Sequence, residues 1–145
     1  MRHKWLAWGL LFAAYLGAFA ANVGHFWWSY DAGWPQILAS VGYMIVWGWF
    51  LISGYRDPKK LRVTMAAGIL TTIGGILGLL ARTFGTGILT ILGLIFAGSA
   101  ITPLYGLLST MEDYDLLYLT AVAFGAVWTI ISCCMKKVQE RKGTR

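Results

Sequence analysis

Long runs without a single charge constrain this chain more than any other feature of its sequence. Residues 63–81 and 88–108 contain no Asp, Glu, Lys or Arg. At 1.5 Å of rise per residue, a helix of about twenty apolar residues matches the ~30 Å hydrocarbon core of a bilayer. Only 12% of the 145 residues are charged, and mean hydropathy is +0.64, whereas a soluble domain is about one-quarter charged. The chain is therefore predicted to be an integral membrane protein.

Five apolar stretches alternate with short polar links. The fold class predicted is all-α, a polytopic membrane bundle of five transmembrane helices that forms one membrane-embedded domain over residues 1–145. The expected spans are 5–28, 35–55, 63–81, 88–108 and 116–134. Proline in a helix removes a backbone donor and bends the chain, so Pro103 is expected to kink the fourth span.

The arrangement of charges does not decide how often the chain crosses. Cytoplasmic loops carry an excess of Lys and Arg, yet five crossings place six of these residues on each side of the membrane. Four crossings with a re-entrant segment within 63–108 would instead put both basic ends on one side. Five crossings are preferred, because two separate uncharged runs lie in that region, and four remain the alternative.

Five crossings would also bring the basic link 56–62 and the acidic link 111–115 to one membrane face. Ion pairs are then expected between Lys59, Lys60 or Arg62 and Glu112, Asp113 or Asp115. Arg82 is expected to meet lipid phosphate or Asp31.

Small residues recur at helical spacing in the last three spans. Lipid gives helices little hydrophobic reason to associate, so close backbone approach through small side chains holds them together. Packing within the chain's own bundle is the preferred interpretation, and a seam for a second copy or a partner subunit is the alternative. The predicted helix-packing residues are Ala67, Thr71, Gly74, Gly78, Gly93, Ala97, Ala121 and Gly125.

Aromatic and polar residues gather where the first two spans meet, which makes a shallow ligand site conceivable there. The candidate ligand-binding residues are Asn22, His25, Trp28, Tyr30, Asp31, Trp34 and Gln36. An aromatic belt at the membrane boundary is the simpler interpretation. The aromatic face formed by Tyr43, Trp47 and Phe50 is interpreted as core or lipid contact.

The sequence contains no pattern typical of a catalytic, metal or cofactor site. All six carboxylates lie in links or the tail, whereas ion-coupled transporters usually carry such groups inside the membrane. We expect no enzyme activity, no cofactor, no metal and no nucleic-acid partner. Two hypotheses remain for a multi-pass protein of the cell membrane: a non-enzymatic subunit that packs against itself or a partner, or a small transporter or binding component for an uncharged or aromatic solute.

Overall fold

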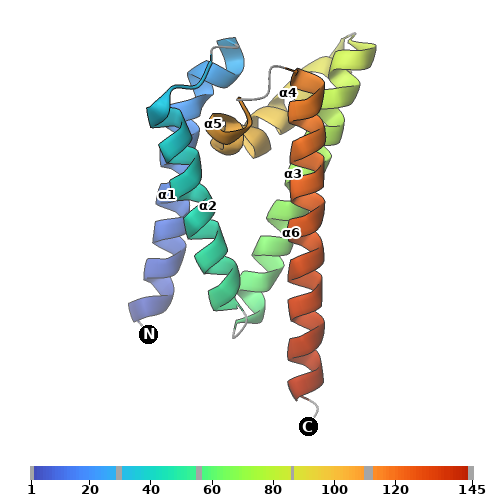
Figure 1. Ribbon diagram of the computed structural model, residues 1–145. Coiled ribbons are helices and arrows are strands. Elements are labelled where there is room, and N and C mark those ends of the chain that lie inside the picture. Colours follow the sequence, from blue (N-terminus) through green and yellow to red (C-terminus); the bar gives the residue numbers. More distant parts are fainter. Residues whose placement is uncertain (1, 29–30, 55–56, 86, 110–112, 144–145) are drawn as a thin grey trace.

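The computed structural model describes residues 2–28, 31–54, 57–85, 87–109 and 113–143. Within them the chain forms α1 (Arg2–Trp28), α2 (Trp34–Gly54), α3 (Pro58–Phe84), α4 (Ile88–Ile101), the 3-10 turn η1 (Thr102–Leu104), α5 (Tyr105–Leu108) and α6 (Tyr114–Gly143) (Figure 1). Five helical stretches in this part of the chain are long and apolar enough to cross a membrane. The prediction of an all-α bundle is confirmed.

Three helices, α1, α3 and α6, are longer than their predicted spans because polar residues continue them. Asp57 caps α3, its side chain accepting a hydrogen bond from the Lys59 amide at 3.0 Å, and Pro58 occupies the first turn, where no amide donor is required. At the other terminus, α6 runs through the predicted tail to Gly143, and Lys136 pairs with Glu140 one turn later at 3.8 Å.

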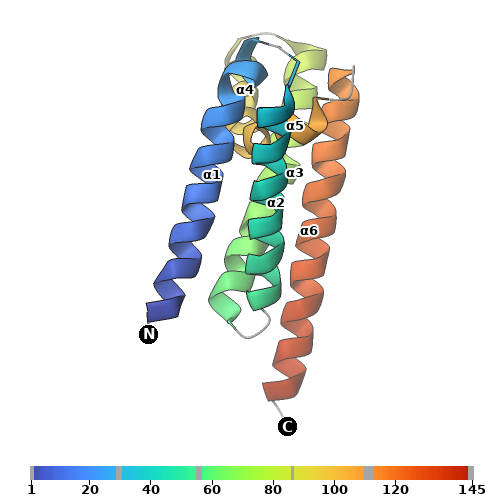
Figure 2. The same ribbon diagram turned by 60° about the vertical axis from the view of Figure 1, so that its left-hand side comes forward.

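Four helices run the length of the bundle in alternating directions (Figures 1 and 2). Trp8 packs edge-on against Phe50 at 5.0 Å and Asn22 bonds to Ser40, so α1 and α2 are antiparallel. A Cβ on Gly54 would lie 3.2 Å from the Cβ of Lys60, which places the end of α2 beside the start of α3. Along α3 and α6, Gly68 faces Thr129 and Arg82 bonds to Asp115, so these two helices are also antiparallel.

The segment formed by α4, η1 and α5, which we call the re-entrant hairpin, does not run the length of the bundle. It begins just after α3, and α6 begins beside the end of α3, as the 3.2 Å ion pair between Arg82 and Asp115 shows. Gly74, which faces Phe96 and Ala100, lies ten residues before the end of α3, or about 15 Å of helix. The hairpin thus descends about halfway and returns.

The turn of the hairpin lies at Pro103, in the 3-10 turn, at the proline expected to bend this span. Its path is the one described by the alternative of four full-length helices and a re-entrant segment. In five full-length helices, Arg82 and Asp115 would lie at opposite ends. The fifth apolar stretch, Thr90–Leu108, is therefore long and apolar enough to cross a membrane. It does not, however, run from one end of the bundle to the other.

This arrangement corrects the expected ion pairs. Lys59, Lys60 and Arg62 lie in the first turns of α3, while Asp113 and Asp115 lie at the start of α6, at the opposite end of the bundle. Arg82 takes Asp115 as its partner, and its guanidinium also lies 5.3 Å from the Tyr114 ring centroid. Glu112 lies outside the described residues.

Candidate functional site

The predicted ligand-binding cluster separates into outward and inward groups. Trp28 and Trp34 are 72% and 77% exposed, so they match an aromatic belt better than a binding pocket. Asp31 is also exposed, and Tyr30 lies outside the described residues. The three remaining residues, Asn22, His25 and Gln36, point into the junction of α1 and α2.

His25 joins the link after α1 to the first turn of α2. Its Nδ1 lies 3.0 Å from the Asp31 carbonyl oxygen and its Nε2 lies 2.9 Å from Gln36 Nε2. A carbonyl oxygen only accepts hydrogen bonds, so Nδ1 carries the proton and Nε2 accepts from the Gln36 amide. The two contacts of the His25 ring connect the end of α1 to the start of α2.

Asn22 belongs to a fully buried polar contact that we call the clamp, formed with Ser40 and Gly106. Asn22 Nδ2 donates to the Ala18 carbonyl oxygen at 2.8 Å and to Ser40 Oγ at 3.2 Å. The Gly106 amide donates to the same Ser40 oxygen at 3.1 Å. Asn22 and Ser40 are completely buried, so the clamp joins α1, α2 and the returning arm of the hairpin out of reach of solvent.

The clamp tolerates no side chain at Gly106. A Cβ there would overlap the Gln36 carbonyl oxygen and lie 2.7 Å from Ser40 Oγ. Non-helical backbone is tolerated at membrane depth only where protein or a water-filled cavity surrounds it. Thr102, Pro103 and Leu104 at the hairpin turn are all buried, and the clamp fixes the arm that follows them.

A cavity of about 410 Å³, the central cavity, lies beside the hairpin between the α1–α2 pair and α3. Drug-sized ligands typically occupy pockets of roughly 300–1,000 Å³. Its lining residues come from α1, α2, α3 and α4: Tyr15, Tyr43, Trp47, Ala67, Leu70, Thr71, Phe96, Ser99 and Ala100.

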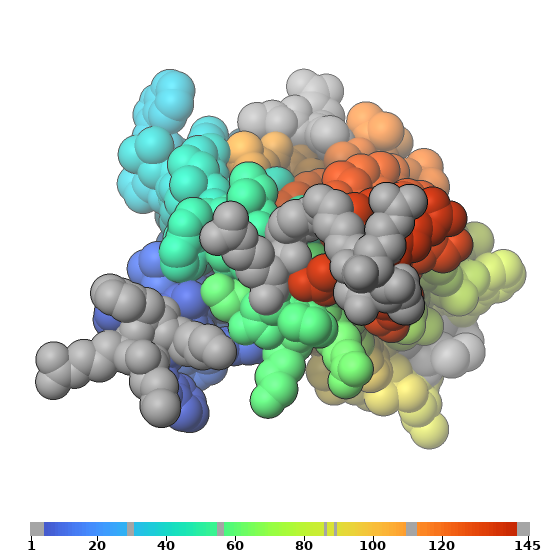
Figure 3. Space-filling view, turned by 90° about the horizontal axis from the view of Figure 1, so that it is seen from below, coloured from blue at the N-terminus to red at the C-terminus, as the bar shows by residue number. Residues whose placement is uncertain are grey.

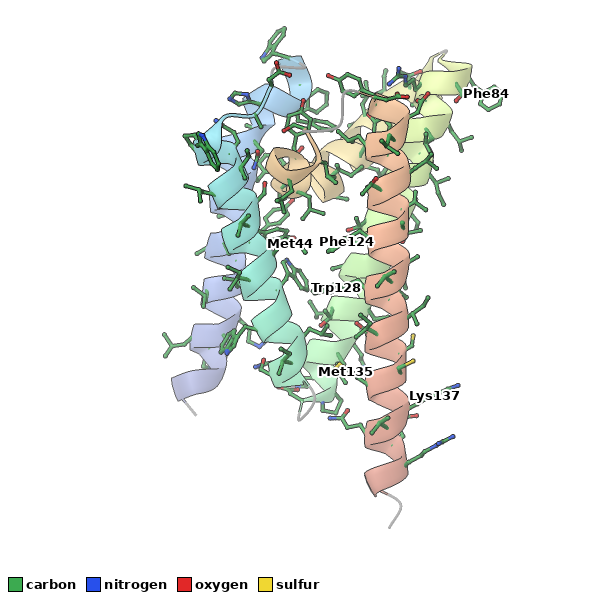
Figure 4. The ribbon with its side chains drawn as sticks, viewed as in Figure 1. Met44, Phe84, Phe124, Trp128, Met135 and Lys137 are labelled. Atoms are coloured by element: carbon green, nitrogen blue, oxygen red, sulfur yellow. The ribbon has the colours of Figure 1, made fainter. Side chains whose placement is uncertain are left out.

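A narrow crevice continues the central cavity toward α6. The two share Tyr43, Trp47, Ala67 and Thr71. In Figure 4, Met44 of α2 and Phe124 and Trp128 of α6, which line the crevice, point toward the space below α5. Lys137 lies well below them and points away from the bundle.

The described lining of the central cavity has hydroxyl groups and aromatic rings but no charged side chain. The Tyr15 hydroxyl donates to the Ser99 carbonyl oxygen at 2.9 Å, which ties α1 to α4 across the cavity wall. Thr71 donates to the Ala67 carbonyl oxygen at 2.9 Å. Such a lining accommodates an uncharged molecule and would penalise an ion, because transfer of a charge into an apolar site is costly without a partner.

Two apolar residues of the cavity lining are partly exposed. Leu70 is 51% exposed and Phe96 is 41% exposed. The same face of the bundle carries other exposed apolar side chains of α3 and α4, such as Ile73 and Leu92.

The predicted helix-packing residues lie in three different environments. Gly74 faces Phe96 and Ala100 of α4, whereas Gly78, one turn later, faces the Tyr118 ring of α6. Gly93 of α4 faces the Leu77 carbonyl oxygen and Ala81 of α3, and Gly125 of α6 faces Gly68 and Thr72 of α3. Ala97 and Ala121 are fully buried in one core cluster, and Ala67 and Thr71 line the central cavity.

Several residues that build these contacts are absent from the sequence-based candidates. Gly68 and Gly75 complete the seam between α3 and α6, and their spacing of seven residues, two helical turns, is the signal that marks them. Ser40 and Gly106 are 66 residues apart, and no local pattern connects them. Tyr43 and Trp47, which were interpreted as core or lipid contact, do pack against the core clusters, and they also line the central cavity.

Comparisons of this chain with models of protein families, with curated proteins and with solved structures each found no match.

Proposed function

We propose that this protein binds an uncharged, membrane-soluble aromatic molecule in the central cavity, as a small transporter or a binding component. The observation that carries the proposal is the cavity of about 410 Å³ with an aromatic and hydroxyl lining. Rings of Tyr43 and Trp47 offer edge and face contacts to an aromatic ligand, and Thr71 and Ser99 offer polar groups for orientation.

Exposed apolar residues near the cavity support the choice of a lipophilic ligand. Leu70 and Phe96 of the lining are partly exposed, and Ile73 and Leu92 of the same two helices are exposed as well. A hydrophilic solute would require a polar path from one end, and the described lining contains no ionisable Asp, Glu, Lys, Arg or His. The candidate site thus moves from the α1–α2 junction to the middle of the bundle.

Photolabelling with benzophenone, an uncharged aromatic, tests the proposal. The purified protein in lipid nanodiscs is irradiated with increasing benzophenone, and adducts are located by peptide mass spectrometry. We expect saturable labelling of peptides that contain Tyr43, Met44 or Trp47. Labelling that rises linearly and follows only the lipid-exposed residues would refute a defined site.

Two neighbouring alanines of α3 provide a matched pair of variants. Ala67 lines the central cavity, whereas Ala66 is exposed on the outer surface. Ala67→Leu fills part of the cavity and should abolish saturable labelling, while Ala66→Leu adds the same volume outside and should leave it intact. Equal labelling of the two variants would contradict binding at this cavity.

The hypothesis of an accessory subunit remains a second proposal with less support. It was based on small-residue seams, but Gly74, Gly78, Gly93 and Gly125 each face another helix of this chain. Native mass spectrometry from nanodiscs would decide whether a second copy binds, and affinity purification from the source cell would show whether another membrane protein does. A lone protomer in both measurements would leave this proposal without support.

A further inference from the structure

The two ends of the bundle differ strongly in charge once the hairpin is placed. The basic end comprises the start of α1, the end of α2, the start of α3 and the end of α6, and the acidic end comprises their opposite termini. Described residues at the basic end include nine Lys and Arg: Arg2, Lys4, Lys59, Lys60, Arg62, Lys136, Lys137, Arg141 and Lys142.

The acidic end has the reverse balance. Arg82 is its one described Lys or Arg, and it is paired with Asp115. Asp31 and Asp113 lie at the same end, in the links before α2 and α6. Among the described residues, the basic end therefore carries nine Lys and Arg and the acidic end carries one.

The basic end also presents its charges outward. Lys59, Arg62, Lys137 and Arg141 are exposed, and Figure 3 views the molecule from this end, with the start of α3 (green) between α2 and the end of α6 (red). Lys60 is an exception. It is 8% exposed, donates to Ser53 Oγ at 3.0 Å and lies 5.2 Å from the Phe50 ring centroid.

We infer that the basic end is a binding surface for the anionic phospholipid headgroups of the cytoplasmic leaflet, and that the chain crosses the membrane four times. Cytoplasmic segments near membrane spans carry the excess of Lys and Arg, and anionic headgroups attract clustered basic side chains. Both termini are then cytoplasmic, and the re-entrant hairpin enters from the outer face. The central cavity lies on the cytoplasmic side of the hairpin turn.

Cysteine accessibility in intact cells tests the orientation. In a Cys133→Ala, Cys134→Ala background, single cysteines replace Lys59, Thr83, Asp113 and Glu140, and a membrane-impermeant maleimide is applied outside. Four crossings predict that positions 83 and 113 react from outside, while 59 and 140 react only after permeabilisation. Five crossings place 83 and 113 on opposite sides, so protection of one of them alone would overturn the inference. Reaction of 59 and 140 alone would reverse the orientation and overturn it as well.

Lipid binding is tested separately in nanodiscs of phosphatidylcholine with and without phosphatidylglycerol. Native mass spectrometry counts the anionic lipids that stay bound to the protein as collision energy rises. We expect the variant Lys136→Gln, Lys137→Gln, Arg141→Gln to retain at least threefold less phosphatidylglycerol than the parent, and Arg82→Gln at the acidic end to retain the parent amount. Equal retention by the two variants would overturn the headgroup assignment, whatever the accessibility of the cysteines.

Discussion

The substitution Gly125→Ala tests the close approach of α3 and α6 more directly than any other change. The added Cβ would lie 2.6 Å from the Gly68 carbonyl oxygen and 2.7 Å from the Thr72 amide nitrogen. Ordinary van der Waals contact begins at 3.4 Å, so the two helices would have to separate by about 0.8 Å. The Thr72 Oγ1 would lie 2.5 Å away as well, and rotation of that side chain would not relieve the overlap with these two backbone atoms.

The expected cost follows from that separation. Overpacking of this kind typically destabilises by about 1–3 kcal/mol, and we expect Gly125→Ala to lower the apparent free energy of unfolding by this amount. Gly17→Ala is the matched control, because nothing lies within 4 Å of a Cβ at that position. Alanine there should stabilise the helix by up to about 1 kcal/mol relative to glycine. The two identical substitutions should therefore act in opposite directions.

Equilibrium unfolding in mixed micelles of dodecyl maltoside and increasing dodecyl sulfate would measure the difference, with circular dichroism and tryptophan fluorescence as readouts. A gap of at least about 1 kcal/mol between the variants is expected. If Gly125→Ala unfolds at the same detergent fraction as Gly17→Ala, the seam between α3 and α6 is not as close as described. That result would also remove the basis for placing Arg82 beside Asp115.

Three further changes test other contacts. Ser40→Ala leaves the Gly106 amide without its side-chain acceptor and should destabilise the protein by about 1–3 kcal/mol. Ser99→Ala should have much less effect in the same assay, because the exposed Ser99 hydroxyl donates to the Phe96 carbonyl oxygen within its own helix. Arg82→Gln removes an ion pair between side chains that are 45% and 54% exposed, so thermal unfolding in detergent should reveal a loss of no more than about 1 kcal/mol, and a larger loss would show that the pair is shielded. Lys60→Gln removes the ammonium contacts to Trp49 and Phe50 and should cost about 0.5–2 kcal/mol, while Lys59→Gln, at an exposed neighbour, should be neutral.

Apolar helices and their approximate bounds follow from the sequence because hydropathy depends on composition alone. The direction of the segment 88–108 does not follow from the sequence. An uncharged run is equally compatible with the hydrocarbon core whether it crosses the membrane or turns back within it. Its return depends on contacts such as that between Ser40 and Gly106, which are distant in sequence. The count of Lys and Arg could not reveal this path either, because five crossings place six of these residues on each side.

The candidate site, like the fold, could be predicted only in part from the sequence. Residue types at the α1–α2 junction predict a polar aromatic cluster, and the structure indeed brings His25 and Gln36 together. The central cavity, however, is formed by side chains from four helices, and its volume depends on how far α3 stands from α2. Sequence spacing identifies the face of α2 that carries Tyr43 and Trp47, but it does not reveal which helix lies opposite.

The pairing of α3 with α6 has a consequence for synthesis. Helix α1 finds its partner α2 next in the chain, whereas 29 residues separate Phe84 from Tyr114. The glycine face of α3 and the hairpin turn therefore leave the ribosome before the helix that completes the seam. During that interval Leu104 and Tyr105 of the hairpin lack Leu117 and Tyr118 of α6, which share their buried core cluster. A chain truncated before Tyr114 should therefore be a substrate for membrane quality-control proteases.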